Sequence, residues 1–428
     1  ASYGPGRPKT SIDRFSPVAY SLTRPHIRRR ATERRLAGTM RYQDVPDKVI
    51  RRMSELRRAF HRHPELAFEE KQTAAVIIAE LKAMGLPYSY GGTGSGVIAD
   101  LHASEGMPTI ALRADMDALP GAENTDLPFA SSIEGKMHAC GHDAHMAMVL
   151  GAARLLVDAP PNVNVRFVFQ PAEERGGGAR TVIASGALDG VDAIFGGHGP
   201  QHYRVGEIMV ASGVITAQSD RFAIDVRGKG GHGARPHEAT DAVVVSAVLI
   251  MALQTLVSRE VDPVHPSVVT VGRIEGGSAP NVIAETARLE GSIRTTRADI
   301  REHIHSGIHR MARALGELHN ARLEVGIDAG YPPVVNSSRE AELAHRAAAR
   351  VVGQQGLMQM DHPSMGAEDF SYYLEKIPGC YVRFGARPSG DSYVPLHSPA
   401  FDIDEGVLPV GAAYFAQVCA DFVVEQPT

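Results

Sequence analysis

The chain has 428 residues, of which 43% are hydrophobic and 22% are charged, a balance that is ordinary for a globular protein of two or more domains. A net charge of -5 gives no reason to expect nucleic acid or an anionic membrane as a partner. No continuous apolar run approaches the roughly 18 residues of a membrane span. The three cysteines, Cys140, Cys380 and Cys419, are too few for a disulfide framework. They suit a reducing compartment, so we expect a cytoplasmic protein.

The first 39 residues differ from the rest of the chain in charge. Residues 1–39 hold eight Arg and one Lys against only Asp13 and Glu33, and they lack the apolar core of a secretory signal. A basic targeting segment is one interpretation. We favour the other, a disordered tail or an upstream extension with Met40 near the natural start of the protein.

The next stretch alternates predicted helices with predicted strands. A helix is expected over 46–62, because Ile50, Met53 and Leu56 recur at helical spacing and a proline suits the first helical turn. The segments that follow are a helix at 73–84, strands at 97–101 and 109–113, a helix at 142–157, and strands at 164–169 and 192–195. This alternation predicts an α/β fold with a mostly parallel sheet, whose ligands collect at the carboxyl ends of the strands.

The order of the predicted elements changes near residue 215. The segments here are a strand at 222–227, a helix at 241–257, strands at 267–274 and 287–294, a helix at 300–318 and a strand at 322–329. A β-α-β-β-α-β order is that of a ferredoxin-like unit. We therefore predict an inserted domain at residues 215–330, which divides a catalytic domain into residues 40–214 and 331–428.

The segment 137–145 carries a thiol, three imidazoles and a carboxylate just before the predicted helix at 142–157. Cys140 and His142 are separated by one glycine, so both can face one ion, and thiolate, imidazole and carboxylate are the usual zinc ligands. Glu174, His198 and His397 would join them from distant loops. A site assembled from several loops is typical of catalysis, whereas a structural zinc site would show paired Cys-x-x-Cys motifs, which are absent from the sequence.

Two adjacent acids, Glu173 and Glu174, follow the predicted strand at 164–169. Neighbouring side chains at a strand end point in different directions, so Glu174 can bind the metal while Glu173 acts on a water that the metal activates. Glu173 is then the predicted general base, and later the general acid toward the leaving nitrogen. The alternative, a solvated surface pair, is disfavoured by the preceding strand and by Gln170-Pro171.

Five motifs occur in a fixed order along the chain: Leu-Arg-Ala-Asp-Met-Asp-Ala-Leu-Pro at 112–120, His-Ala-Cys-Gly-His-Asp at 138–143, Gln-Pro-Ala-Glu-Glu at 170–174, Gly-Lys-Gly-Gly-His at 228–232 and Ala-Glu-Asp-Phe at 367–370. Together they resemble the amidohydrolase branch of the aminoacylase/carboxypeptidase metallopeptidases, which includes hippurate hydrolases, auxin–amino acid conjugate hydrolases and N-acyl-amino acid deacetylases. The resemblance covers about residues 41–425. It is specific for the family and only weakly specific for the substrate.

The resemblance implies a catalytic domain that holds two divalent metal ions. Zinc fits the donor set best, and manganese, cobalt or nickel could occupy the same site. Glu173 matches the general acid/base, and Asp117 matches the residue that orients the metal site. Asp115 stands where other branches carry a metal-binding histidine, so its role is open. The matching ligand positions are Cys140, His142, Glu174, His198 and His397.

The resemblance also implies that the inserted domain is a lid that mediates dimerisation, so a homodimer or a larger homo-oligomer is expected. His232 matches a lid histidine that reaches the partner subunit's active site and polarises the scissile carbonyl. Asn281 and Arg294 match lid positions that hold the substrate carboxylate, and the planar fork of arginine suits that task. The alternative for Arg294 is an ordinary surface residue on a strand.

The expected function is a metal-dependent amidohydrolase that cleaves N-acyl amino acids or related small amides. A dipeptidase or carboxypeptidase would use the same centre with a different acyl pocket. A thiol hydrolase with Cys140 as nucleophile and His142 as base is a second enzyme class, and a small-molecule binder without turnover is the non-enzyme alternative. Glu368 could line the pocket, and His145 could support the site or be structural.

Overall fold

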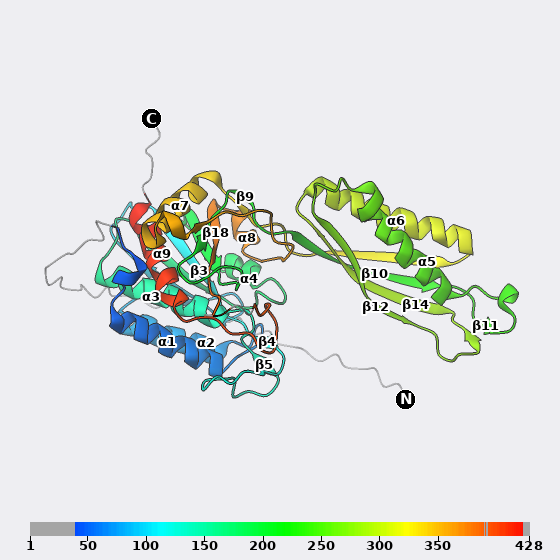
Figure 1. Ribbon diagram of the computed structural model, residues 1–428, viewed down its shortest axis with the longest axis horizontal. Helices are drawn as coiled ribbons and strands as arrows, with labels where there is room; N and C mark the ends of the chain where they lie inside the picture. Colours follow the sequence, from blue (N-terminus) through cyan, green and yellow to red (C-terminus); the bar gives the residue numbers. More distant parts are fainter. Residues whose placement is uncertain (1–38, 389, 391–392, 423–428) are drawn as a thin grey trace, which may run out of the picture. The chain divides into compact units, whose positions relative to one another are not determined.

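The computed structural model describes residues 39–388, 390 and 393–422 (Figure 1). The predicted basic extension at 1–39 lies outside these residues apart from its last position. The helix predicted at 46–62 is observed as α1 (Asp47–Arg62), and the helix predicted at 73–84 as α2 (Lys71–Ala83).

Strands of an eight-stranded sheet lead into several of the predicted motifs, since β3, β6 and β7 end at Asp115, Gln170 and His198. Its central strands pair in parallel, β3 with both β6 and β7, and β7 with β18. The pairs β1 with β2, β2 with β6, and β8 with β18 are antiparallel, whereas β8 pairs in parallel with β17 at the edge. A short turn joins β1 to β2, so these two can only run antiparallel. The strand order is β1 (Tyr88–Gly91), β2 (Gly96–Leu101), β6 (Asn164–Gln170), β3 (Thr109–Asp115), β7 (Ala193–His198), β18 (Gly379–Phe384), β8 (Ile208–Met209) and β17 (Leu357–Met358).

Helices cover both faces of this sheet (Figure 1). One face packs against α1, α2, α3 (His142–Asp158), α7 (Ser338–Val352) and α9 (Val407–Asp421), whose apolar residues share one core with the strands. The other face packs against α4 (Gly178–Ala184) and α8 (Ser371–Leu374). The helix α3 is buried almost along its whole length, so the residues at its start are held rigidly.

A second, four-stranded antiparallel sheet has its own hydrophobic core. Its strand order is β12 (Ser267–Gly276), β14 (Thr286–Thr295), β10 (Gln218–Arg227) and β15 (Arg322–Ala329), and it is covered by α5 (Ala242–Thr255) and α6 (Ala298–His319). Along the chain these elements follow the order β-α-β-β-α-β. Contacts group the described residues into one compact unit, so the separate domain at 215–330 stays a prediction.

The remaining elements are short. The strand pairs are β4 (Leu119–Pro120) with β5 (Lys136–Met137), β9 (Gly213–Val214) with β16 (Val335–Asn336), and β11 (Gly231–His232) with β13 (Val282–Ile283). Single turns of other helix types are η1 (Tyr42–Asp44), η2 (Pro236–Glu238), η3 (Leu256–Glu260) and η4 (Gln354–Gly356).

The apolar helix α5 corrects the expectation that no segment of the chain approaches the length of a membrane span. Together with η3 it forms one helical stretch, Ala242–Glu260, that is long and apolar enough by composition to cross a membrane, with 33% of its most apolar window buried. The buried part packs on the four-stranded sheet through Val245, Leu249 and Leu253. A core helix of a globular domain can have the same length and composition, so these two properties do not assign α5 to a membrane.

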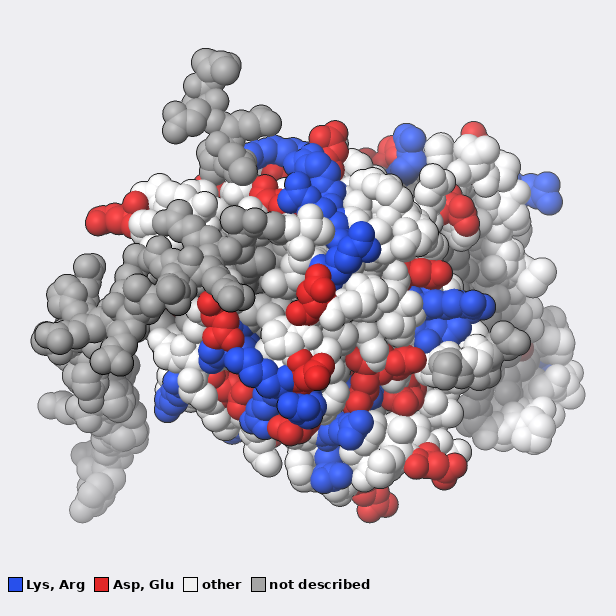
Figure 2. All heavy atoms as spheres, turned by 60° about the vertical axis from the view of Figure 1, so that its left-hand side comes forward, with Lys and Arg blue, Asp and Glu red and all other residues white. Residues whose placement is uncertain are grey.

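The surface charge is mixed. On the face drawn in Figure 2, Lys and Arg side chains lie among Asp and Glu side chains, and no large area of one sign is seen. This distribution agrees with the small net charge of -5.

Candidate active site

The loop before α3 sets the position of the first two predicted ligands. Gly141, between Cys140 and His142, has a φ of 88° and is the N-cap of α3. This left-handed conformation is open to glycine at little steric cost, and it reverses the chain so that α3 begins at His142. Both flanking side chains are buried.

The structure brings all five predicted ligands together. The donor atoms of Cys140, His142 and His198 lie within 4.8 Å of one another, and so do those of Cys140, Glu174 and His397. The Cys140 Sγ lies 3.2 Å from His198 Nε2, and His397 Nε2 lies 3.1 Å from Glu174 Oε1. His397 comes from a loop whose backbone N–H donates to the Ala139 carbonyl over 2.8 Å, which ties that loop to the loop before α3.

The donor atoms fit a divalent cation. The Nδ1–H of His142 donates to the Asp117 carbonyl over 2.8 Å, which leaves Nε2 as the free lone pair. That Nε2 is buried and has no hydrogen-bond partner among the described residues, and the same holds for His198 Nδ1. A histidine ring fixed by a carbonyl at one nitrogen and open at the other is the usual arrangement of a metal ligand. Thiolate, imidazole and carboxylate donors at one point match zinc and similar metals.

Burial and neighbouring charges shift the protonation of the donors. Burial and the Glu174 carboxylate raise the pKa of the Cys140 thiol well above its usual value. Burial would also raise the pKa of Glu174, but His397 and His142 lower it. Burial, Glu368 and Glu174 raise the pKa of Glu173 well above its usual value. The two adjacent glutamates therefore differ, with Glu174 anionic and Glu173 favouring its protonated form.

Glu173 is held beside the donor cluster by its backbone. Asp117 accepts the N–H of Glu173 over 2.9 Å with one oxygen and the N–H of Glu174 over 3.0 Å with the other. The preceding Ala172 has a φ of 54°, uncommon for a residue with a Cβ, and its N–H donates to Glu70 over 2.9 Å. These contacts fix the direction in which the two glutamate side chains leave the end of β6.

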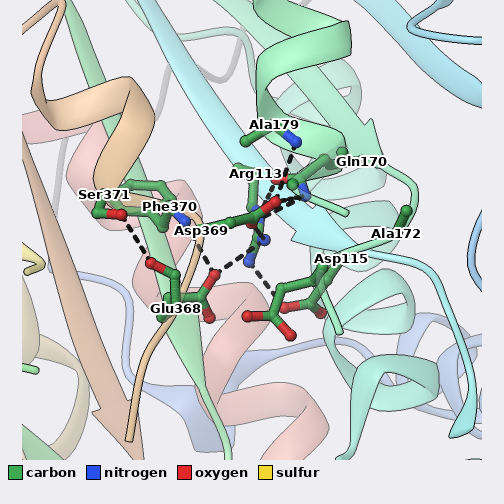
Figure 3. Close-up of polar contacts among 12 residues, drawn as sticks. Arg113, Asp115, Gln170, Ala172, Ala179, Glu368, Asp369, Phe370 and Ser371 are labelled. Atoms are coloured by element: carbon green, nitrogen blue, oxygen red, sulfur yellow. Dashed lines mark hydrogen bonds and ion pairs between the residues drawn. The ribbon is translucent and has the colours of Figure 1, made fainter. Parts of the chain in front are cut away.

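Beneath the donor cluster lies a buried ion network centred on Arg113 (Figure 3). Its guanidinium donates to Gln170 Oε1 over 2.9 Å, to Asp115 Oδ2 over 2.7 Å, and to Glu368 and Asp369 over 3.0 Å each. Sequence reasoning gave Arg113 no role. The signal was a charged pair, Arg113 and Asp115, within an otherwise apolar strand, where only paired charges are tolerated.

The network also answers two questions that the sequence left open. The second oxygen of Asp115 accepts from His145 Nδ1 over 2.7 Å, and His145 Nε2 accepts from the Gly199 N–H over 3.0 Å. Both ring nitrogens of His145 and both oxygens of Asp115 are therefore engaged. The pair links β3 to the residue after His198 and supports the cluster from behind. Glu368 joins the same network and lines the cavity.

A cavity of about 610 Å³ opens onto the donor cluster. Cys140, Glu173, Glu174, His198 and His397 line it, and so does Arg294 of β14, whose Nη1 donates to the Met365 carbonyl over 3.0 Å. A partly buried arginine in the cavity of the donor cluster favours a binding role over that of an ordinary surface residue.

His232 and Asn281 lie elsewhere. His232 is in β11 and is exposed, and Asn281 directly precedes β13, where its carbonyl accepts the Gly233 N–H over 2.8 Å. Neither is among the described residues that line the cavity. The action of His232 in a partner subunit's site and the contact of Asn281 with the substrate carboxylate stay predictions.

These features define a class of protein. Cysteine, histidine and glutamate donors at the carboxyl edge of a parallel sheet, with a buried glutamate beside them in a cavity, are the parts of a metal-dependent hydrolase. Comparison with known proteins then gives the family. The sequence profile described as peptidase family M20/M25/M40 matches residues 111–421, and the chain belongs to that family.

Individual relatives agree with this assignment. The N-acetyl-L-cysteine deacetylase of Bacillus subtilis is 40% identical over 366 residues, which cover 84% of this chain and 85% of the relative. Thermostable carboxypeptidase 1 of Saccharolobus solfataricus is 36% identical over 387 residues, covering 89% of this chain and 96% of the relative. The crystal structure of a dinuclear metal-binding peptidase from Bacillus subtilis matches with a TM-score of 0.76 at 36% identity, covering 88% of this chain and 98% of that chain. The predicted α/β metallohydrolase fold and the predicted enzyme class, a metal-binding amide hydrolase, are confirmed.

Proposed function

We propose that this protein hydrolyses the amide bond of N-acyl amino acids or closely related small amides. The observation that carries the proposal is the position of Glu173, buried beside the metal-donor cluster in a cavity that also contains Arg294. The name of the Bacillus subtilis deacetylase supports this substrate class. The name of the Saccharolobus carboxypeptidase supports the alternative, a dipeptidase or carboxypeptidase that uses the same centre.

The proposed cofactor is a pair of divalent ions, as in the dinuclear peptidase of Bacillus subtilis. The residues that would hold them are Cys140, His142, Glu174, His198 and His397. When bound, the ions supply Lewis-acid chemistry, since they polarise a carbonyl and lower the pKa of a coordinated water toward about 7. Zinc is the first candidate for this donor set, followed by manganese, cobalt and nickel.

Glu173 would carry the proton in both halves of the reaction. As general base it takes a proton from the attacking water at its carboxylate oxygen, and as general acid it returns that proton to the leaving nitrogen. Its raised pKa suits the second step, because a carboxyl buried near Glu368 and Glu174 holds a proton more readily than an exposed one. Asp117 would keep the side chain aimed at the reacting atoms through the two backbone hydrogen bonds.

The substrate carboxylate would be held by Arg294, with His232 and Asn281 contributed by a second copy of the chain. His232 would donate to the carbonyl oxygen as negative charge develops there. Because His232 in β11 and Asn281 next to β13 lie outside the cavity of their own chain, a dimer is the simplest way to bring them to a reaction. The surface proposed for that dimer is the apolar face of α5 with edge strand β12, whose exposed members are Val243, Val244, Val248, Met251, Val268 and Ile274.

A thiol hydrolase with Cys140 as nucleophile is less well supported. A nucleophilic cysteine needs a lowered pKa, whereas burial raises the pKa of this thiol. The three free, buried cysteines fit the proposal of a reducing compartment such as the cytoplasm.

The test is amine release from a panel of acetyl, benzoyl and long-chain N-acyl amino acids together with dipeptides. The protein is first chelated and then reloaded with Zn, Mn, Co or Ni, with Glu173→Ala as the inactive variant and Glu134→Ala, an exposed acid, as the matched control. Metal-dependent release that is lost only in Glu173→Ala supports the proposal and ranks the substrates. Release that survives chelation but not thiol alkylation would favour Cys140 as nucleophile. Two bound metals without release from any amide would favour a binding protein.

A further inference from the structure

The cavity is rich in arginine, and four of its five arginines have no assigned role. Five arginines line it: Arg175, Arg180, Arg221, Arg294 and Arg383. Three of them are exposed to water, whereas Arg294 and Arg383 are partly buried. Partly buried guanidinium groups are the informative ones, because a charge removed from water is costly unless a partner offsets it.

Arg383 stands next to the donor cluster on the eight-stranded sheet. It belongs to β18, where its Cα partner in the parallel ladder is His198 of β7. Partner residues on neighbouring strands project to the same face of a sheet. Arg383 therefore enters the cavity on the side of the proposed ligand His198, whereas Arg294 enters it from β14 of the other sheet.

The charge of Arg383 is not neutralised within the described part of the chain. No carboxylate there lies within ion-pair distance of it, and its guanidinium packs against the Tyr381 ring, whose centroid is 5.5 Å from Cζ. Arg113 shows the contrast, because its guanidinium is fully paired with the carboxylates of Asp115, Glu368 and Asp369.

The Tyr381 ring does not remove the need for an anion. A cation–π contact of this kind holds the guanidinium in place but leaves its N–H groups and its charge available. Burial, Arg383 and Arg387 also lower the pKa of His202, which shows that the positive charge is felt nearby. A positioned arginine with free N–H groups in a substrate cavity is suited to bind a carboxylate through two hydrogen bonds.

We propose that Arg383 is a specificity-determining residue that binds a second carboxylate, carried by the acyl part of the substrate. The preferred substrates are then N-acyl amino acids whose acyl group is a short dicarboxylic acid joined through one end, such as N-succinyl amino acids. This inference rests on the proposed function, in which Arg294 takes the carboxylate of the amino acid. Arg294 of β14 would hold the carboxylate of the amino acid, and the amide bond would lie at Glu173. The acyl group would then extend toward Arg383 of β18.

The experiment compares two substrates that differ only in charge, N-succinylalanine and N-succinamoylalanine, in the metal-loaded full-length protein. Alanine release gives kcat/KM for wild type, Arg383→Leu, Arg383→Lys and the control Arg51→Leu, an exposed arginine of α1. We expect wild type to favour the succinyl substrate by about 10- to 100-fold, the range of a charge-assisted hydrogen-bonded pair. Arg383→Leu should abolish this preference while retaining activity on the succinamoyl substrate, Arg383→Lys should retain part of it, and Arg51→Leu should match wild type.

The other outcomes are separable. Equal or better cleavage of the neutral substrate by wild type would overturn the role of Arg383 and leave the proposed function standing. An equal loss on both substrates in Arg383→Leu would also overturn it, since the arginine would then serve a part that both substrates share. Absence of alanine release from both substrates and from N-acetylalanine would instead count against the proposed function itself.

Discussion

Two polar regions of this molecule carry predicted catalytic residues, and they are built in opposite ways. At the carboxyl edge of the eight-stranded sheet, Arg113, Asp115 and His142 are 1% exposed or less, and hydrogen bonds hold each of them. On the β11–β13 pair, His232 is exposed, and its side chain has one recorded hydrogen bond, from the Ala234 N–H. The first region can do chemistry with groups from its own chain. The residues of the second region do not line the cavity of their own chain. This position is expected for residues that act in the active site of another subunit.

The largest expected effect belongs to the buried region. Glu173→Gln should lower kcat by roughly 10²- to 10⁴-fold, because it removes the group that moves the proton. Metal content, measured by elemental analysis, should stay at the wild-type value, since the ligands are intact. Glu134→Gln is the matched control. A variant that loses its metal as well would show that Glu173 is a ligand rather than the base.

The exposed region should respond in a way that depends on two chains. His232→Ala should lower kcat by roughly 10²- to 10³-fold, as expected for an oxyanion donor. Mixing it with Glu173→Gln after reversible dissociation should restore about a quarter of wild-type activity, because half of the dimers are mixed and each mixed dimer has one intact site. No recovery in the mixture would mean that His232 acts within its own chain or not at all.

The stability of the buried region depends on its ion network. Arg113→Met should lower the free energy of unfolding by about 3–5 kcal/mol, because Asp115, Glu368 and Asp369 lose their shared cation without reaching water. Urea denaturation measures the change. The control Arg154→Met breaks an exposed pair with Asp158 and should cost about 1 kcal/mol or less. An equal loss of unfolding free energy in the two variants would contradict the prediction that the buried ion network stabilises the site.

The same region should lose stability at high pH through His61. Burial lowers the pKa of this imidazole, but hydrogen bonds to Asp143 and Glu123 outweigh that effect and raise it to about 9. A raised pKa in the folded state means that the stabilisation is complete below about pH 6.5 and is lost as pH rises toward 9, by roughly 3 kcal/mol. Unfolding at pH 6.5, 7.5 and 9 should show this slope in wild type and in the control His63→Gln, and its absence in His61→Gln. A slope that persists in His61→Gln would assign it to another group.

The smallest effect is expected at the start of α5. Asp241 caps this helix by accepting the N–H groups of Val243 over 2.9 Å and Val244 over 3.2 Å. Asp241→Ala should lower stability by about 1 kcal/mol, whereas Asp241→Asn should be nearly neutral. If the exposed face of α5 is a dimer surface, the loss in Asp241→Ala should also weaken the dimer in sedimentation experiments.

Local patterns predicted the elements well where side-chain periodicity was clear. The helix expected at 46–62 is observed at 47–62, and the last strand of the four-stranded sheet begins and ends at the expected residues. Two strands with polar residues at one end are longer in the structure than the sequence predicted. The strand predicted at 109–113 continues to Asp115, and the strand predicted at 222–227 begins at Gln218. In both cases the polar residues remain in the strand because a partner from elsewhere in the chain binds them, as Arg301 binds Asp220.

The sequence alone determined the family, the reaction class and the five candidate metal donors, because the chemistry of a thiol, an imidazole or a carboxylate belongs to the residue and its motif. Tertiary structure decided which nitrogen of His142 is free, why Asp115 and His145 are fully engaged, and which arginines reach the cavity. These properties depend on groups far apart in the chain, such as Arg113 with Glu368 or Arg383 beside His198. A side chain acquires its partners only when strands and loops pack together, so no local pattern could have revealed that Arg113 is paired and Arg383 is not.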